Sequence, residues 1–363
     1  MAYLEWIKQQ TQGKKLCMYP MGLAAKAAFQ KLWDYGIKAD FFSDHNSNLW
    51  GSQIPVERQG TLKGKIECIS KTRLSELDQD DLVVIVETLY YHEIKADLKA
   101  CGVKNVLRIY PEKILVDKFL DTQGEALEER VNAVLEVCAD QESRAVFQYI
   151  ADSWRVWPLP DDYFHCVYKK GQYFDSDLIK LHENEVFVDA GAYTGDTVQQ
   201  FLSFCGGKFE RIHLFELDPA IFVKLEENVA QMKQKNIVCH PVGLSDENKK
   251  ICFSPGDSNS RIGCNGCSDA VGTVGRLDDI LGDERVTFIK MDIEGAEMSA
   301  LVGAENIIRT QKPKLAICIY HSPDDMLNIP LYIKKLVPEY NIYIRHYTDM
   351  MLETVCYAIC DDG

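Results

Sequence analysis

Small and acidic residues follow an apolar, strand-like run in the segment 185–198, EVFVDAGAYTGDTV. A strand here would bring Asp189 to its carboxyl end, and Gly191 and Gly195 would then permit a tight turn before a helix that begins near Asp196. The first turn of that helix would present free N–H groups to a ligand. Because ligands of open α/β sheets bind at the carboxyl ends of the strands, this turn is predicted to bind a ligand close to the backbone.

The residues around this turn argue against NAD as that ligand. Bulky Tyr193 stands where a pyrophosphate would need close approach to the backbone. The next strand-like run, RIHLFEL, reaches Glu216, 21 residues after Gly195 (216 − 195), and a carboxylate at this distance can accept hydrogen bonds from ribose hydroxyls. Asp218 followed by proline is a natural helix start, so a helix should follow directly. The alternative for Glu216 is a solvated carboxylate at a strand end.

A second group of acidic residues lies within the run FIKMDIEGAEMSAL. A buried strand over 286–291 would release Asp292 and Glu294 at its carboxyl end, before a helix that carries Glu297. Such carboxylates can stabilise a positive charge or accept a proton from a hydroxyl. The alternative is that Glu294 and Glu297 only complement the N-terminus of the helix.

His321 ends the next strand-like run, KLAICIYH. A histidine at a strand tip beside Asp292 can orient on the carboxylate and take a proton from a substrate hydroxyl near neutral pH. The alternative is a loop histidine with a satisfied hydrogen bond. Asp292, Glu294 and His321 could also ligate a divalent ion, but no spacing signature requires one, so no metal is predicted.

The motifs FVDAGAYTGDT, FELDP, FIKMDIEGAE and YIRHY…ETVCYAI, in this order and spacing, resemble those of the FkbM-type S-adenosylmethionine (SAM) dependent methyltransferases. The resemblance covers about residues 172–360, and MDIEGAE is its most specific part. It implies a class I methyltransferase fold, with a seven-stranded, mostly parallel sheet and a reversed final strand. It also implies SAM as cofactor and a hydroxyl of a sugar or polyketide-like small molecule as acceptor.

The resemblance also suggests which residues serve the cofactor. Tyr173 belongs to a segment that can close over it, with a core position as the alternative, and the segment 243–246, GLSD, would border the adenine. The segment 258–267, SNSRIGCNGC, stands where the family carries a loop near the active site. The predicted catalytic residues are Asp292, Glu294 and His321, and the predicted cofactor-binding residues are Tyr173, Asp189, Gly191, Ala192, Tyr193, Gly195, Asp196, Glu216, Leu217, Gly243 and Ser245.

Composition limits the other possibilities. The net charge of −15 opposes binding to nucleic acid or anionic membranes. The sequence contains no run of about 18 consecutive apolar residues, so membrane insertion is not expected. The thirteen cysteines are mostly scattered singly, which is typical of reduced thiols and predicts a cytoplasmic protein. Cys264 and Cys267 form a single C-x-x-C pair without a partner motif, so a glycine-rich turn is favoured over a metal site.

The chain of 363 residues is long enough for two domains. Alternating strand-like and helix-like runs predict a Rossmann-like α/β domain over 1–121, a helical connector that begins at 122 and a second α/β domain over 181–363. The resemblance implies that the first is an accessory domain, that the segment 122–180 includes a cofactor-capping part, and that 181–363 is the methyltransferase domain. The first turn of the accessory domain has only Gly22, with Met21 and Ala24 in place of glycines. This favours substrate holding or an interaction over dinucleotide binding.

The function predicted from the sequence is a SAM-dependent O-methyltransferase that acts on a carbohydrate-like hydroxyl of a small-molecule or glycan-precursor acceptor. One alternative is a nicotinamide-dependent sugar-nucleotide oxidoreductase that uses the accessory domain. The other is a noncatalytic protein that binds SAM or a sugar nucleotide, which would need Asp189 and Glu216 but neither Asp292 nor His321.

Overall fold

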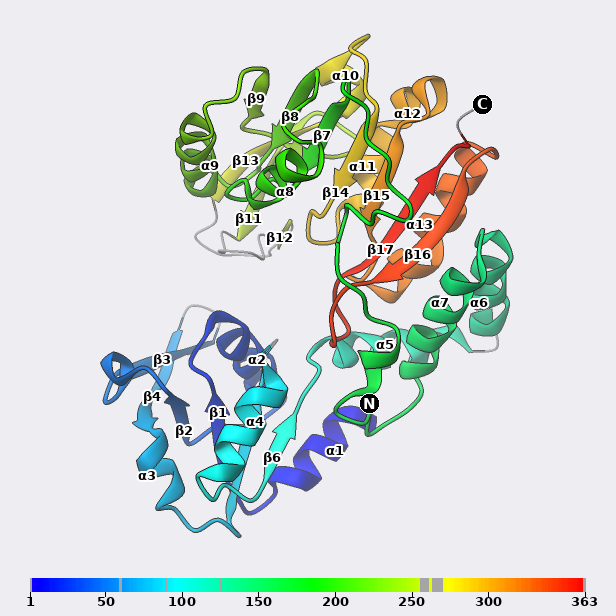
Figure 1. Ribbon diagram of the computed structural model, residues 1–363. Coiled ribbons are helices and arrows are strands. Elements are labelled where there is room, and N and C mark those ends of the chain that lie inside the picture. The colour runs from blue at the N-terminus through cyan, green and yellow to red at the C-terminus, as the bar shows by residue number, and fades with distance from the viewer. Residues whose placement is uncertain are drawn as a thin grey trace. The chain divides into compact units, whose positions relative to one another are not determined.

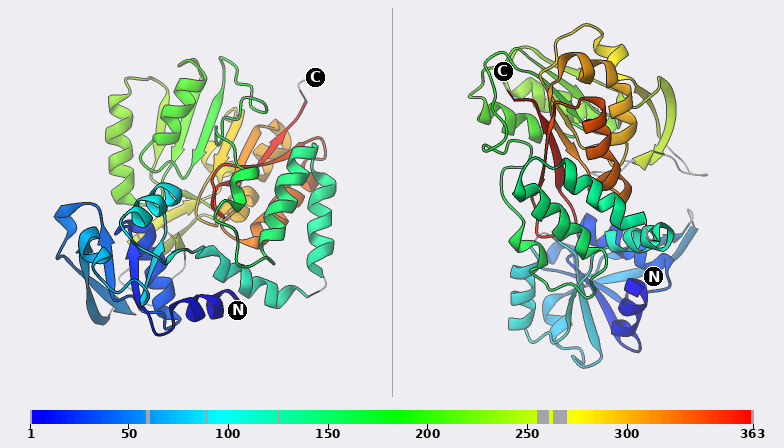
Figure 2. Two further views of the ribbon diagram at one scale, coloured as in Figure 1. Left: turned by 60° about the horizontal axis from the view of Figure 1, so that its bottom comes forward. Right: turned by 90° about the vertical axis from the view of Figure 1, so that its right-hand side faces the viewer.

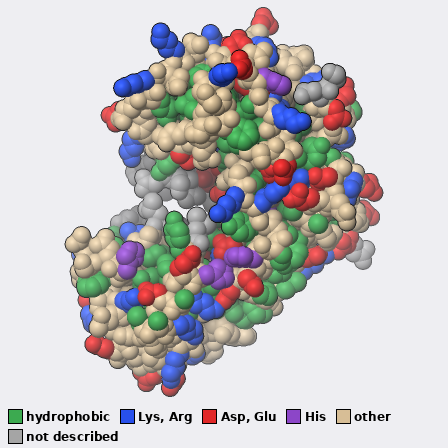
Figure 3. All heavy atoms as spheres, in the orientation of Figure 1, with side chains coloured by type: hydrophobic (Ala, Val, Ile, Leu, Met, Phe, Trp, Pro, Cys, Tyr) green, Lys and Arg blue, Asp and Glu red, His purple; other side chains and the backbone are tan. Residues whose placement is uncertain are grey.

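The computed structural model describes residues 2–58, 61–88, 90–124, 126–254, 261–262 and 270–361. The chain forms two compact units (Figure 1): unit 1 contains Met1–Gly124 and Ser153–Tyr163, and unit 2 contains Glu125–Asp152 and Phe164–Gly363. The segment 122–180, predicted as one connector, is thus divided between the two units. Acidic and basic side chains are intermixed on the face seen in Figure 3.

Unit 1 contains a sheet in the order β3-β4-β2-β1-β5-β6 within its described residues. Every pairing is parallel except that of β3 with β4. This confirms the predicted Rossmann-like α/β arrangement, to which the antiparallel β3 is an unpredicted addition. The strands are β1 (Lys15–Tyr19), β2 (Phe41–Asp44), β3 (Gln53–Arg58), β4 (Thr61–Ser70), β5 (Leu82–Val86) and β6 (Val106–Arg108). The helices are α1 (Ala2–Thr11), α2 (Leu23–Asp34), α3 (Lys71–Ser75), α4 (Tyr91–Ala100) and α5 (Glu112–Gln123), with a 3-10 turn at Ser47–Leu49.

Unit 2 is built on a sheet in the order β16-β17-β15-β14-β7-β8-β9. Only β17 runs antiparallel to its neighbours, so the predicted seven-stranded sheet with a reversed final strand is confirmed. Its strands are β7 (Val186–Ala190), β8 (Arg211–Phe215), β9 (Ile237–His240), β14 (Phe288–Met291), β15 (Lys314–Cys318), β16 (Asn341–His346) and β17 (Thr354–Ile359). The strand order reverses between β7 and β14, which is where open α/β sheets bind their ligands.

Helices lie on both faces of this sheet, with α8 in front of it and α13 behind it in Figure 1, and Figure 2 gives two further views. The helices are α6 (Ala126–Val137), α7 (Gln141–Ser153), α8 (Asp196–Phe204), α9 (Pro219–Gln231), α10 (Leu277–Leu281), α11 (Glu297–Gly303), α12 (Glu305–Gln311) and α13 (Pro323–Leu336), with a 3-10 turn at Tyr163–Cys166. Because helices cover both faces, every residue of β7 and of β14 is buried. The rings of Phe187 and Phe201 stack at 4.5 Å in this core.

A smaller sheet in the order β10-β13-β11-β12 was not predicted from the sequence. Its strands are β10 (Gly243–Leu244), β11 (Lys249–Ser254), β12 (Arg261–Ile262) and β13 (Ala270–Gly275). Apart from β12, the segment 258–267 lies outside the described residues, and so do Cys264 and Cys267. The described cysteines are free thiols, and no helix among the described residues is long and apolar enough to cross a membrane.

Helix α7 belongs to unit 2 because a buried arginine fixes it to β16. The Nη2 atom of Arg345 lies 2.7 Å from Oδ2 of Asp140, and its Nη1 donates to Oγ of Ser143 at 2.8 Å. The same Oγ accepts from the backbone N–H of Ile344. Burial alone would raise the pKa of Asp140, but the hydrogen bonds from Arg345 and Ser143 outweigh it and lower this pKa to about 2.

We therefore expect Asp140→Ala to destabilise unit 2. The substitution leaves the buried guanidinium of Arg345 without its main partner, which should lower the free energy of unfolding by about 2 kcal/mol. Urea denaturation followed by circular dichroism measures this loss. Glu136→Ala, which removes an exposed carboxylate from neighbouring α6, should change stability by less than about 0.5 kcal/mol. Equal stability of the two variants would contradict the anchoring role.

Candidate active site

The turn after β7 is shaped by glycines, as the sequence predicted. Gly191 and Gly195 have φ angles of +77° and +89°, and α8 begins at Asp196. The turn is held to the next strand because the N–H groups of Gly191 and Ala192 both donate to the carbonyl of Phe215, each at 3.0 Å. Ala192 is fully buried, whereas Asp196 is exposed.

Gly191 also brings two loops into backbone contact. A Cβ atom at this position would lie 1.9 Å from the carbonyl oxygen of Asp292, far inside any tolerable contact. The N–H of Asp292 in turn donates to the carbonyl of Ala190 at 3.1 Å. The turn after β7 and the acidic loop after β14 therefore form one continuous surface at the carboxyl edge of the sheet.

Glu216 follows β8 and holds the other side of the turn. Its Oε2 accepts from the N–H of Tyr193 at 3.0 Å, and its Oε1 accepts from the N–H of Asp218 at 2.8 Å. Burial raises the pKa of Glu216, against the lowering effect of these hydrogen bonds. Tyr193 has a positive φ of 46°, and its side chain is exposed. Asp218 caps α9 by accepting from the N–H groups of Ala220 and Ile221, as predicted.

The remaining predicted cofactor residues lie around β10. Leu217 packs on this strand, because a Cβ atom at Gly243 would lie 3.3 Å from its Cβ. Ser245 is buried, and its hydroxyl donates to Oδ1 of Asp246. The carbonyl oxygen of Ser245 lies close to Gly303 of α11, because a Cβ atom on Gly303 would be 1.9 Å from this oxygen. Leu217 and Gly243 thus contact each other, whereas the backbone of Ser245 contacts α11.

Asp189 is fully buried and pairs with a lysine that the sequence analysis did not single out. Lys290 on β14 stands opposite Asp189 in the parallel register, and its Nζ lies 2.9 Å from Oδ1 of Asp189. The same ammonium donates to the carbonyl of Gly191 at 3.0 Å. Burial would lower the pKa of Lys290, but the carboxylates of Asp189 and Asp292 outweigh it and raise the pKa, so the lysine stays charged.

Asp292 is the centre of the acidic loop. Its Oδ2 accepts from the hydroxyl of Tyr173 at 2.7 Å, and its Oδ1 accepts from the hydroxyl of Tyr320 at 3.2 Å. Burial would raise the pKa of Asp292, but the charges of Lys290 and His321 and these hydrogen bonds lower it. Tyr173 also covers the ammonium of Lys290, which lies 5.2 Å from its ring centre.

His321 lies between three carboxylates. Its Nε2 is 3.5 Å from Oδ1 of Asp292 and 3.7 Å from Oε2 of Glu294, and its Nδ1 is 3.1 Å from Oε1 of Glu297. Burial would lower the pKa of His321, but the three carboxylates outweigh it and raise the pKa to about 9. The structure thus brings together all three predicted catalytic residues, and it makes the imidazole cationic at neutral pH rather than the neutral base expected from the sequence.

Two further carboxyl groups border this cluster. Burial and the nearby charge of Asp292 raise the pKa of Glu353 to about 7, and Glu353 accepts a hydrogen bond from Gln172. Burial, with a smaller contribution from Glu297, raises the pKa of Asp325 to about 6. Burial, with the added effect of the neighbouring carboxylates, therefore keeps these two carboxyl groups partly protonated near neutral pH.

Sequence reasoning missed Lys290, Tyr320 and Glu353. Lys290 could have been found, because a lysine inside an otherwise apolar strand must have a charged or polar partner when it is buried. Tyr320 and Glu353 carry no comparable local signal, since their role depends on how distant segments of the chain meet.

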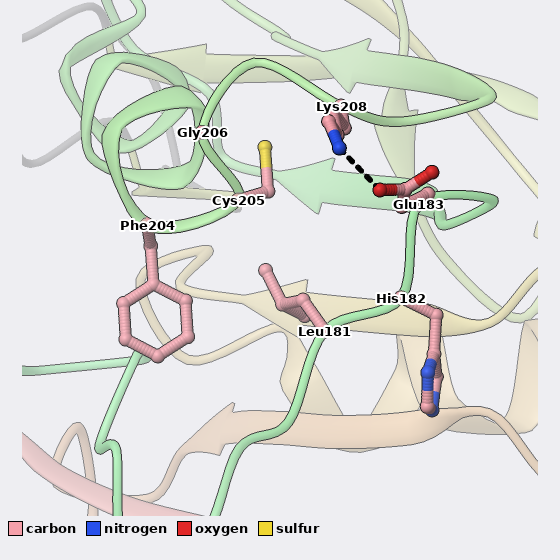
Figure 4. A pocket seen from close by; sticks show the side chains of 7 residues that line it. All are labelled: Leu181, His182, Glu183, Phe204, Cys205, Gly206 and Lys208. Carbon is pink, nitrogen blue, oxygen red and sulfur yellow. Dashed lines mark hydrogen bonds and ion pairs between the residues drawn. The ribbon is translucent and has the colours of Figure 1, made fainter.

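The pocket in Figure 4 lies elsewhere. It has a volume of about 430 Å³, and an ion pair between Lys208 and Glu183 crosses it. Its lining residues precede β7 or lie at and just after the end of α8, which puts the pocket at the amino-terminal ends of the strands and away from the acidic cluster. They are Leu181, His182, Glu183, Phe204, Cys205, Gly206 and Lys208.

A known crystal structure shares this fold. The crystal structure of methyltransferase FkbM from Methylobacillus flagellatus KT is 23% identical in sequence to this chain and has a TM-score of 0.70. The match covers 99% of this chain and 94% of that protein. An rRNA methylase from Streptococcus thermophilus (14% identity, 49% of this chain, 87% of that chain) has a TM-score of only 0.34. A putative methyltransferase from Streptococcus mutans in complex with SAH (13% identity, 49% of this chain, 91% of that chain) has a TM-score of 0.32. The TM-scores of the last two structures are too low to indicate a shared fold.

No curated protein matches the sequence significantly. Residues 189–340 match the family model for the methyltransferase FkbM domain, a range that includes the turn after β7, Glu216, the acidic loop and His321. The chain therefore carries a methyltransferase FkbM domain, which confirms the family resemblance predicted from its sequence.

Proposed function

We propose that the protein transfers a methyl group from SAM to a hydroxyl of a carbohydrate-like or other small-molecule acceptor. The proposal rests on one observation: the turn after β7 and the acidic loop after β14 touch each other at the carboxyl edge of the sheet. The turn bordered by Glu216 is in backbone contact, through Gly191, with the loop that bears Asp292. A cofactor on the turn and an acceptor at the acidic cluster would then be neighbours.

The cofactor part of the proposal rests on Glu216. Its two oxygens each accept one backbone hydrogen bond and retain lone pairs for two ribose hydroxyls. The exposed ring of Tyr193 and the first turn of α8 border the same turn. Leu217 and Gly243, which pack together after β8 and β9, are proposed to border the adenine.

The acceptor part rests on the charges of the cluster. Asp292 is held ionised by its lysine and tyrosine neighbours, so it can attract the sulfonium of SAM and accept a hydrogen bond from the acceptor hydroxyl. Positioning the oxygen in line with the methyl carbon is the main requirement of this reaction. Several carboxylates gathered beyond the ends of β14 and β15 suit an acceptor with several hydroxyls, which favours a carbohydrate-like molecule.

His321 is proposed to receive the hydroxyl proton once it has lost its own. With a pKa of about 9, only about one molecule in a hundred has a neutral imidazole at pH 7. The free cysteines suit a reducing compartment, so a cytoplasmic location is part of the proposal.

Replacing Glu216 tests the cofactor assignment. Glu216→Ala should weaken SAM binding at least about tenfold, or about 1.4 kcal/mol, because the ribose loses a charged acceptor. Isothermal calorimetry with SAM and S-adenosylhomocysteine measures the change. Glu227→Ala removes an exposed carboxylate from α9 and should bind SAM as the wild type does. A folded Glu216→Ala protein with unchanged affinity would rule out the assignment.

The pH dependence of turnover tests His321. If the neutral imidazole accepts the proton, turnover at saturating SAM should rise about tenfold per pH unit from pH 6 towards a plateau near pH 9. His321→Ala should lower turnover by about 10²–10⁴-fold and abolish this slope, while SAM affinity remains nearly unchanged. The base role fails if the folded variant keeps the wild-type profile.

A further inference from the structure

The first turn of unit 1 repeats the hydrogen bonds of the proposed cofactor turn in unit 2. Asp44 ends β2, 22 residues after Gly22 (44 − 22), and its Oδ2 accepts from the N–H of Met21 in the turn after β1 at 2.8 Å. Its Oδ1 accepts from the N–H of Asn46, two residues further on, also at 2.8 Å. Glu216 in unit 2 likewise joins the turn after β7 to the backbone two residues beyond itself. Both units thus place a carboxylate of the same kind at the end of their second strand.

This carboxylate lies where open α/β sheets bind their ligands. The order β3-β4-β2-β1-β5-β6 reverses between β1 and β5, so a ligand is expected at the carboxyl ends of these strands. Phe42 on β2 and Ile85 on β5 belong to one core cluster, which also contains residues of α2. Because side chains two residues apart on a strand share a face, Asp44 and Glu87 point to that same face. They therefore flank the end of β1 on the face that α2 covers.

Glu87 is a buried polar side chain whose hydrogen bonding is incomplete. Its N–H donates to the carbonyl of Tyr19, the last residue of β1, at 3.2 Å, which fixes Glu87 beside the turn. The residue is only 5% exposed, yet its Oε2 has no hydrogen-bond partner among the described residues. Burial, with a smaller contribution from Glu112, raises the pKa of Glu87 well above its ordinary value, against the charge of Arg108. A protonated carboxyl group at this place can donate to an anion that binds at the turn.

The start of α2 suits the negative charge of a phosphate. The helix has 12 residues, its N-cap Gly22 makes no side-chain hydrogen bond, and its first turn contains no acidic residue. Its first N–H groups are therefore available to an anion, and Lys26 near the start of the helix adds a positive charge. A Cβ atom at Gly22 would meet none of the described atoms within 4 Å, so the space over the turn is open.

The residues after Asp44 offer an aromatic surface. Nε1 of Trp50 donates to the carbonyl of Asp44 at 2.8 Å, and Trp50 is 44% exposed. The next residue, Gly51, donates to the carbonyl of Cys68 on β4, so Trp50 lies on the side of Asp44 that faces away from β1. Nucleic-acid bases stack on aromatic rings of this kind. The ring of His45 lies 3.3 Å from Oδ1 of Asp44, but its side chain is 78% exposed and can turn aside when a hydroxyl binds.

We propose that unit 1 binds a nucleoside monophosphate, with the base on Trp50, the ribose hydroxyls at Asp44 and the phosphate at the start of α2 beside Glu87. A single phosphate fits the turn better than a pyrophosphate, because Met21 stands where close approach of a pyrophosphate to the backbone needs glycine. This binding stands independently of the proposed methyl transfer, which uses the carboxyl edge of unit 2.

Isothermal calorimetry with AMP, GMP, CMP and UMP tests the site in the purified full chain. The titrations are done with saturating S-adenosylhomocysteine, which keeps the proposed cofactor site of unit 2 occupied. At least one nucleotide should bind with one equivalent, and its 2′-deoxy form should bind at least about tenfold more weakly, because Asp44 loses a hydroxyl donor. Asp44→Asn should remove this preference for ribose, and Trp50→Ala should weaken binding at least about fivefold.

Asp81→Asn is the matched control, because it removes an exposed carboxylate just before β5, at the opposite edge of the same sheet. Its nucleotide affinity should stay within about twofold of the wild type, since exposed charges are screened. No saturable binding of any of these nucleotides at millimolar concentration would overturn the proposal, and so would equal affinity of the wild type for the ribose and deoxyribose forms. Both outcomes can be read even if every variant fails to fold.

A variant of the other unit separates the two proposed sites. Glu216→Ala should keep the nucleotide affinity of the wild type, because Glu216 belongs to unit 2. Loss of nucleotide binding in Glu216→Ala, with Asp44→Asn unchanged, would place the nucleotide in unit 2 and overturn the proposal. The heat of S-adenosylhomocysteine binding to the same samples shows separately whether the proposed cofactor site fails.

Discussion

A single buried lysine ammonium holds the carboxyl edge of unit 2 together. Lys290 is almost fully buried, pairs with Asp189 on the neighbouring strand and donates to the carbonyl of Gly191 in the glycine turn. A buried charge of this kind is tolerated only when it is closely paired, so both strands and the turn must keep their register. The ammonium also helps to keep Asp292 ionised at the tip of its own strand.

The site follows from this constraint. Because β7 and β14 are adjacent where the strand order reverses, the turn after one and the acidic loop after the other meet at Gly191. Glu216 closes the turn from β8, and His321 reaches the acidic loop from β15. The cofactor and acceptor parts of the proposed reaction are thus linked through main-chain contacts and one buried ion pair, and small shifts of either loop should affect both.

The sequence predicted what depends on local chemistry. Gly191, Gly195 and the helix cap Asp218 were found because tight turns and helix starts restrict residue type, and the strand tips of Asp292 and His321 followed from apolar runs that end in polar residues. The sequence did not predict the partner of Asp189, which depends on the register between strands about a hundred residues apart, or the cationic state of His321, which depends on three carboxylates meeting at one ring. Tyr173 was expected to serve the cofactor, and its hydrogen bond to Asp292 depends on the same long-range packing.

The most direct test of this account compares Lys290→Met with the double variant Asp189→Asn, Lys290→Met. The single variant should lose about 3–5 kcal/mol of stability, because Asp189 is left as a buried unpaired charge, and the double variant should recover most of it. Turnover should stay low in both, since Asp292 and the carbonyl of Gly191 lose their cation in either case. Urea denaturation and methyl-transfer assays on both proteins measure these effects. Wild-type turnover in the refolded double variant would contradict the account.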